Sequence, residues 1–188
     1  MRKTLFIALL ACLVSFGAGG VYAHSVDCKK VERTAEVKAQ LQEDVIATLE
    51  TMVGKKETLG ANWSPEIKAI LVSVGINYPA YYCAAYVSWG YTQNKICNPN
   101  TAWSPSLFPA DRCLNLKTTT PQIADAFGIY HHDLNRIAHA GTVKRWPREG
   151  DYFISLEGNT NNNGSRNGDG FYEKRRPKRS VAKVSRWV

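Results

Sequence analysis

The chain has 188 residues, of which 44% are hydrophobic and 21% are charged. This length and composition are typical of a globular domain and exclude a largely disordered chain. The formal net charge is +8, but two positive charges lie within residues 1–23 and a net six lie within residues 171–188. Residues 24–170 are therefore electrically balanced, which argues against a nucleic-acid-binding protein with a basic stripe across its body.

The first 23 residues have the three parts of a secretory signal peptide. Two basic residues precede an apolar run over residues 5–14, and small residues then lead to Ala23. We predict cleavage after Ala23 and an exported mature protein. A lipoprotein signal that acylates Cys12 is the second interpretation, although it would cut inside the apolar run. The run is about half as long as a membrane span, so we expect no membrane span after the signal is removed.

Three helices are predicted in the first half of the mature chain. Apolar residues recur at three- and four-residue steps from about 29 to 53, which indicates an amphipathic helix. Residues 64–66 combine an N-cap serine, a first-turn proline and a glutamate, and they predict a second, short helix. Residues 83–89 predict a third helix, whose first turn contains Cys83.

The second half of the chain has the alternation and turn residues of β-structure. We predict strands near residues 126–131, 136–144, 151–157 and 170–175, with a turn between the first two. Helices followed by strands predict an α+β domain with an antiparallel sheet. The polar segment from Asn159 to Asp169 is predicted to be a loop.

Four cysteines remain once the signal peptide is removed: Cys28, Cys83, Cys97 and Cys113. Export permits disulfides. Cys97 and Cys113 flank a polar loop, and a bridge that closes about fifteen residues would stabilise the fold by about 3 kcal/mol. We prefer this pair, although a sequence does not fix connectivity, and the pairing state of Cys28 stays open.

The same region offers groups for nucleophilic chemistry. Acyl transfer by a cysteine needs a thiolate, a nearby base and a third group that orients the base. Among the cysteines, only Cys83 lies in the first turn of a predicted helix, where unpaired backbone N–H groups favour the thiolate. Cys83 is therefore the predicted nucleophile.

A histidine and two possible orienting groups lie in the predicted sheet. Strict alternation along the strand 136–144 places four side chains on one face, namely Ile137, His139, Gly141 and Val143. Gly141 leaves room for another group to approach His139. If the next strand stays extended, either Glu157 or Asn159 can hydrogen-bond the imidazole of His139.

Each of these features also has a purely structural interpretation. An isolated cysteine in an exported protein is more often half of a disulfide, and an inward histidine is usually a core residue. The Asn-rich loop lacks the acidic spacing of a calcium loop, and His131 and His132 have no further ligand at zinc spacing. We therefore expect neither a metal nor another cofactor.

Three segments, taken together, resemble the CHAP family of cysteine, histidine-dependent amidohydrolases and peptidases. They are YPAYYCAAYVSW at 78–89, IAHAGTV at 137–143 and ISLEGNTN at 154–161. Their order and spacing are more specific than any one of them, and the resemblance covers about residues 64–175. It implies a papain-like α+β fold, with N-terminal helices packed on a small antiparallel sheet, and cleavage of peptidoglycan.

The resemblance also implies a role for each matching residue. Cys83 would be the nucleophile, His139 the base and acid, and Glu157 with Asn159 the orienting groups. The backbone N–H of Cys83 would donate to the oxyanion, and a hydroxyl of one of the preceding tyrosines would supply a second donor. Two residues are further candidates for binding substrate: Tyr82 and Arg166.

These expectations divide the chain into a signal peptide over 1–23, an N-terminal helical extension over 24–60 and a CHAP-like catalytic domain over 61–188. The expected function is that of an exported monomer that cleaves an amide bond in the stem peptide or cross-bridge of peptidoglycan, with no nucleic-acid partner. Two alternatives stay open. One is a domain that binds wall peptide without cutting it, and the other is a delivered toxin that modifies proteins, for example by deamidation.

Overall fold

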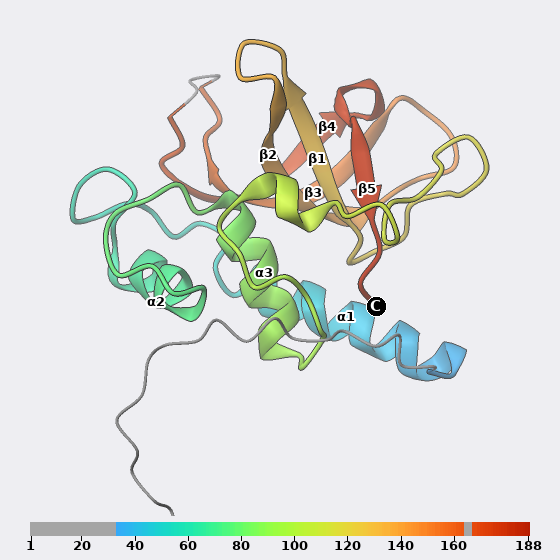
Figure 1. Ribbon diagram of the computed structural model, residues 1–188, viewed down its shortest axis with the longest axis horizontal. Coiled ribbons are helices and arrows are strands. Elements are labelled where there is room, and N and C mark those ends of the chain that lie inside the picture. Colours follow the sequence, from blue (N-terminus) through green and yellow to red (C-terminus); the bar gives the residue numbers. More distant parts are fainter. Residues whose placement is uncertain (1–32, 164–166) are drawn as a thin grey trace, which may run out of the picture.

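A computed structural model describes residues 33–163 and 167–188 (Figure 1). The predicted signal peptide, Cys12, Cys28 and Arg166 lie outside the described residues. The elements follow one another as α1 (Ala35–Glu50), α2 (Pro65–Ser73), α3 (Cys83–Gln93), the 3₁₀ helix η1 (Ser104–Leu107), β1 (Ala126–His131), β2 (Arg136–Arg145), β3 (Tyr152–Thr160), β4 (Gly170–Pro177), the 3₁₀ helix η2 (Lys178–Ser180) and β5 (Lys183–Ser185).

The helices begin where their sequences place capping groups. The hydroxyl of Thr34 accepts a hydrogen bond from the backbone N–H of Val37 at 3.4 Å, and that of Ser64 accepts from the N–H of Ile67 at 3.2 Å. Such caps satisfy N–H groups that have no partner within the helix. In contrast, α3 starts at Cys83 without a side-chain cap. The backbone N–H groups at the start of α3, where Cys83 lies, are therefore not occupied by a side-chain cap.

The strands form one five-stranded antiparallel sheet in the order β4-β3-β2-β1-β5. The four predicted strands are present, and the α+β class is confirmed. The prediction missed β5, which pairs with the edge of β1 from Ala126↔Ser185 to Gly128↔Lys183. Three residues are too short a segment to show a period of two, so only the pairing with β1 defines this strand.

Two apolar clusters lie on opposite faces of the sheet. The consecutive residues Ala126 and Phe127 in β1 belong to different clusters, as the alternation of a strand requires. The larger cluster holds the three helices against one face, and α3 lies between the sheet and α1 (Figure 1). The smaller cluster covers the other face and includes Phe127, Val143, Phe153 and Val184.

The helix α1 is part of the same packed unit as α3, although the sequence suggested an extension over 24–60. Leu49 of α1 is fully buried, and its backbone carbonyl accepts a hydrogen bond from the hydroxyl of Tyr86 at 2.5 Å. A Cβ at Gly90 of α3 would lie 2.7 Å from the Leu49 side chain. This close approach gives α1 a structural role in holding α3 against the sheet.

A β-bulge interrupts β2 beside the predicted histidine. Ile129 pairs with His139 and Tyr130 pairs with Ile137, so Ala138 has no partner of its own on β1. The bulge breaks the strict alternation of side chains. The prediction that Ile137 and Val143 share a face is therefore wrong, because Ile137 packs in the helix-side cluster and Val143 in the opposite one. No helix among the described residues is long and apolar enough to cross a membrane.

Candidate functional site

Cys83 occupies the N-terminal position of α3 and is only 4% exposed. Its thiol is free, and its Sγ lies 3.5 Å from the Oγ of Ser104 at the start of η1. Burial raises the pKa of this thiol, but the hydrogen bond and positive charge of His139, with a smaller contribution from Ser104, outweigh burial and lower the pKa to about 7. A large fraction of the thiol is therefore ionised near neutral pH.

His139 lies in β2 between the thiol and a carboxylate. Its Nε2 is 2.8 Å from Oε2 of Glu157, which leaves Nδ1 as the ring nitrogen for Cys83. Burial lowers the pKa of His139, but the contacts with Cys83 and Glu157 outweigh burial and raise the pKa to about 9. Between about pH 7 and 9, these two pKa values favour a thiolate–imidazolium pair; because the groups are coupled, the values describe the pair.

Glu157 is the carboxylate that contacts His139, and it is fully buried in β3. Its Oε1 accepts hydrogen bonds from the hydroxyl of Ser155 at 2.6 Å and from Nε of Arg176 at 2.8 Å, and its Oε2 accepts from Nη2 of Arg176 at 2.6 Å. Burial raises the pKa of Glu157, but Arg176 and His139 outweigh burial and hold the pKa far below its ordinary value. The carboxylate therefore stays charged and fixes the ring of His139.

Arg176 is the functional contact that sequence reasoning missed. It lies in β4, beside β3, and binds both oxygens of Glu157 with a planar, two-pronged geometry. The sequence showed Arg176 only as one of several basic residues near the C-terminus. Strand alternation offered a signal, because Arg176 pairs with Phe153, which lies four positions before Glu157 in β3 and so on the same face of the strand.

Gly141 allows Glu157 to reach the histidine. A Cβ at this position would lie 2.8 Å from Cγ of Glu157 and 2.7 Å from the ring of Phe127. Both distances are too short for a real Cβ contact, so a side chain at 141 would displace the carboxylate or the ring. The structure thus confirms the prediction that Gly141 leaves room beside His139.

Asn159 does not contact His139. The register of β3 and β4 slips between Gly158 and Thr160, and the backbone of Asn159 takes a positive φ of 53°. Its side-chain amide donates to Oδ1 of Asn62. The expectation that β3 stays extended through Asn159 is wrong, because this bulge turns the side chain away from the face of Glu157.

Tyr82 is placed in the core and not at a substrate-binding surface. Its side chain is fully buried, its ring centroid lies 5.1 Å from that of Phe171, and its hydroxyl donates to Glu57 at 3.2 Å. This placement contradicts the expected role of Tyr82 in binding substrate. The neighbouring Tyr81 is exposed instead. The other substrate-binding candidate, Arg166, lies outside the described residues.

The predicted disulfide between Cys97 and Cys113 is wrong. Cys113 carries a free thiol, which donates to the backbone carbonyl of Phe108 at 3.4 Å, whereas Cys97 is disulfide-bonded. Because Cys83 is also free, neither Cys83 nor Cys113 is the partner of Cys97. The backbone explains part of this result, since Cys113 is held beside the edge strand by its pairing with Ser185.

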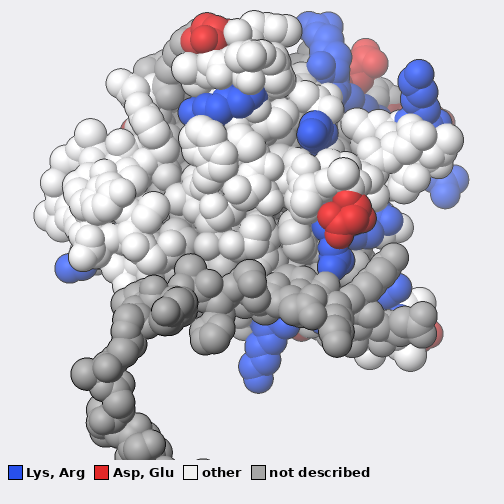
Figure 2. Space-filling model, in the orientation of Figure 1, with Lys and Arg blue, Asp and Glu red and all other residues white. Residues whose placement is uncertain are grey.

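Two basic residues of the C-terminal strand β4 are held by contacts within the fold. On the face drawn in Figure 2, Lys and Arg side chains are separated by uncharged surface. Arg176 is bound to Glu157, and the Nζ of Lys174 donates to the backbone carbonyl of Asn161. The structure therefore assigns these two cations to internal contacts.

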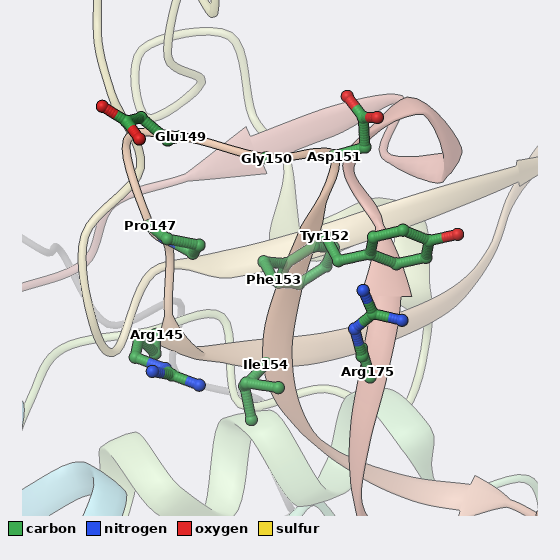
Figure 3. Close-up of a pocket in the computed structure, with 9 residues that line it drawn as sticks. All are labelled: Arg145, Pro147, Glu149, Gly150, Asp151, Tyr152, Phe153, Ile154 and Arg175. Atoms are coloured by element: carbon green, nitrogen blue, oxygen red, sulfur yellow. The ribbon is translucent and has the colours of Figure 1, made fainter.

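A cavity of about 220 Å³ lies at the β2–β3 turn, and Figure 3 shows its lining residues. Arg145 and Arg175 lie toward one end of it and Glu149 and Asp151 toward the other. None of its lining residues belongs to the Cys83 site. Within residues 33–163 and 167–188, no group of three or more His, Cys, Asp or Glu side chains could hold a metal ion.

The arrangement can support nucleophilic chemistry with proton transfer. A buried thiol that is ionised near neutral pH lies beside an imidazole, and a buried carboxylate fixes that imidazole. The cysteine lies at a helix N-terminus and the histidine lies on an antiparallel sheet.

Comparisons with known proteins find little that is similar. No protein-family model and no curated protein match the chain. Among solved structures, NlpC1 from Trichomonas vaginalis is similar over 87% of this chain, with a TM-score of 0.46 and 14% sequence identity. The chain spans about half of the length of that protein, 48%. A likeness this weak carries no argument about activity.

Proposed function

We propose that this protein is an exported cysteine hydrolase that cleaves an amide bond in the peptide part of bacterial peptidoglycan. One observation carries the reaction class: the thiol of Cys83, the imidazole of His139 and the buried carboxylate of Glu157 form one connected chain of contacts. The peptidoglycan substrate rests on the CHAP resemblance of the three segments around these residues, and export rests on the signal-like first 23 residues.

The first step of the proposed reaction forms a thioester. The thiolate of Cys83 attacks the carbonyl carbon of the amide, and a tetrahedral oxyanion forms. Backbone N–H groups at the start of α3, including that of Cys83, would donate hydrogen bonds to this oxyanion. The imidazolium of His139 then donates its proton to the amide nitrogen, the C–N bond breaks, and the amine product leaves.

The second step returns the enzyme to its starting state. Neutral His139 takes a proton from water while the water oxygen attacks the thioester carbonyl. The C–S bond breaks, the carboxylic acid product leaves, and Cys83 is again a thiolate beside an imidazolium. Glu157 stays ionised throughout, because Arg176 and Ser155 hold it, and it stabilises the imidazolium without taking its proton.

Digestion of purified peptidoglycan by the mature protein tests this proposal. We expect mass spectrometry to find peptide fragments with one new amine and one new carboxylate for each bond cut. Cys83→Ser should release none of these fragments. Cys113→Ser is the matched control, since it removes the other described free thiol, and it should release the same fragments as the wild type.

The same experiment separates the alternatives. Sedimentation with peptidoglycan, without fragments, would favour a domain that binds the wall peptide without cutting it. Conversion of glutamine to glutamate in an added protein substrate, dependent on Cys83 and without wall fragments, would favour a protein-modifying toxin. Either result would overturn the proposed substrate.

A further inference from the structure

Trp103 and Arg136 form a pair at the surface beside the reacting groups. Trp103 directly precedes Ser104, whose hydroxyl lies 3.5 Å from Sγ of Cys83. Arg136 is the first residue of β2, three positions before His139, or about 10 Å along a strand. The segment that carries Trp103 therefore contacts the thiol of Cys83 through Ser104, and the strand that carries Arg136 also carries His139.

The side chains of the pair stack on one another. The guanidinium carbon of Arg136 lies 4.3 Å from the centroid of the Trp103 ring, which is a cation–π distance. Trp103 is still 53% exposed, so much of the indole faces solvent. An exposed tryptophan that holds an arginine in place offers a flat apolar surface beside a fixed positive charge.

Arg136 has no acidic partner within the part of the chain that the structure describes. Its one described hydrogen bond is from Nη1 to the adjacent backbone carbonyl of Ile137 at 3.2 Å. Two other arginines of the sheet region do have buried acidic partners, because Arg176 binds Glu157 and Arg186 binds Asp125. A guanidinium carries five N–H donors in a fork that matches a carboxylate. Arg136 therefore has donors left for an acidic ligand.

We propose that the Trp103–Arg136 pair binds a carboxylate of the peptide substrate and thereby places the scissile amide at Cys83. This inference rests on the proposed function. The guanidinium of Arg136 would bind the carboxylate. The aliphatic part of the substrate residue that carries this carboxylate would lie on the indole of Trp103. Since an extended peptide spans about 3.3 Å per residue, the carboxylate would lie within about three residues of the amide that is cut.

Synthetic stem tetrapeptides with the sequence L-Ala–γ-D-Glu–L-Lys–D-Ala test this proposal. One probe carries both carboxylates, a second has the D-Glu α-carboxylate as an amide, and a third has the C-terminal carboxylate as an amide. The wild type should lose about 10- to 100-fold in kcat/KM on one of the two amides, mostly through KM, because a charged hydrogen-bonded pair is lost. The amide that loses activity identifies which carboxylate is bound.

Variants of the pair complete the experiment. Arg136→Gln should lower kcat/KM on the free tetrapeptide by the same factor, should remove the discrimination between probes, and should leave the alkylation rate of Cys83 unchanged. The kcat/KM of Arg136→Lys should lie between those of the wild type and Arg136→Gln, because a lysine keeps the positive charge and loses the two-pronged hydrogen bonding of the guanidinium. Arg145→Gln, at the far end of β2, is the matched control and should behave as the wild type.

Binding to the Cys83→Ser variant separates this inference from the proposed function. If the wild type cuts no probe, but Cys83→Ser binds the free tetrapeptide more tightly than one of its amides and Arg136→Gln abolishes that difference, the subsite stands and the hydrolase proposal falls. If the wild type cuts all three probes equally, or Arg136→Gln cuts them as the wild type does, the subsite is overturned and the hydrolase proposal stands. If the wild type cuts no probe and Cys83→Ser binds all three probes equally, both the hydrolase proposal and the subsite are overturned.

Discussion

The buried carboxylate of Glu157 contacts Nε2 of His139 at 2.8 Å, which fixes the imidazole with its Nδ1 toward Cys83. This contact raises the pKa of His139, because the carboxylate favours the imidazolium. The imidazolium in turn favours the thiolate and lowers the pKa of Cys83. Glu157 thus favours the thiolate of Cys83 through His139, without contacting the sulfur.

The ionisation of Cys83 should follow the charge of His139. In a Cys113→Ser background, the rate of alkylation by iodoacetamide should rise as the pH passes about 7, the pKa of Cys83, and fall away below it. His139→Gln removes the positive charge, so the midpoint should move to at least the ordinary cysteine value of about 8.5. Equal midpoints in the two proteins would show that His139 does not act on the thiol.

Glu157 should matter far more than Asn159. Glu157→Gln should lower kcat/KM by about 10²- to 10⁴-fold, as expected when the group that orients a catalytic histidine loses its charge. The pKa of His139 should fall from about 9, so the alkaline limb of the pH–rate profile should move to lower pH. Asn159→Gly, which tolerates the positive φ, should retain most activity. A larger loss in Asn159→Gly would contradict the assigned orientation.

Arg176 should stabilise the fold through Glu157. Arg176→Met leaves a buried carboxylate without its cation and should lower the free energy of unfolding in urea by about 3 kcal/mol. The stability from Glu157 is present above its unfolded pKa of about 4.3 and is lost as the pH falls toward its lower folded pKa. Removal of Arg176 raises the folded pKa of Glu157, so acidification should cost the variant less stability than the wild type, and the loss should be complete at a higher pH. Arg175→Met is the control, since Arg175 stacks on the half-exposed Tyr152, and it should change stability little.

Gly141 should be intolerant of any side chain. Gly141→Ala puts a Cβ 2.8 Å from Cγ of Glu157 and should cost about 1–3 kcal/mol of stability with a marked loss of kcat/KM. Gly90→Ala introduces similar crowding against Leu49, remote from the site. It should lose comparable stability and keep its activity in the folded fraction. The same loss of activity in both variants would show a general effect of destabilisation.

The two cysteines of the loop region, Cys97 and Cys113, should differ in chemistry. Alkylation of the unreduced protein, followed by peptide mapping, should label Cys113 and leave Cys97 unlabelled until a reductant is added. Burial raises the pKa of Cys113, so its labelling should need mildly alkaline conditions. A tryptic fragment in which Cys97 and Cys113 are cross-linked would contradict this assignment.

The sequence alone predicted most of the elements and offered Cys83 and His139 as candidates, which the CHAP resemblance then favoured. The local signals were the cap at Ser64, the alternation in residues 136–144, which the bulge interrupts, and a cysteine in the first turn of a helix. Each of these signals depends on neighbours within a few positions of the chain, where spacing fixes geometry. Cys83 and His139 could therefore be named as candidates, and Gly141 as the position that leaves room beside His139.

Tertiary structure decided which groups complete the site. The choice of Glu157 over Asn159 follows from the bulge at Asn159, and a bulge is defined by pairing with a strand that comes later in the chain. Arg176 became part of the site because β4 lies beside β3, which places its guanidinium on a carboxylate nineteen positions away. Periodicity tells which face a residue takes while a strand stays regular; long-range pairing decides where it stops being regular and which charges then meet.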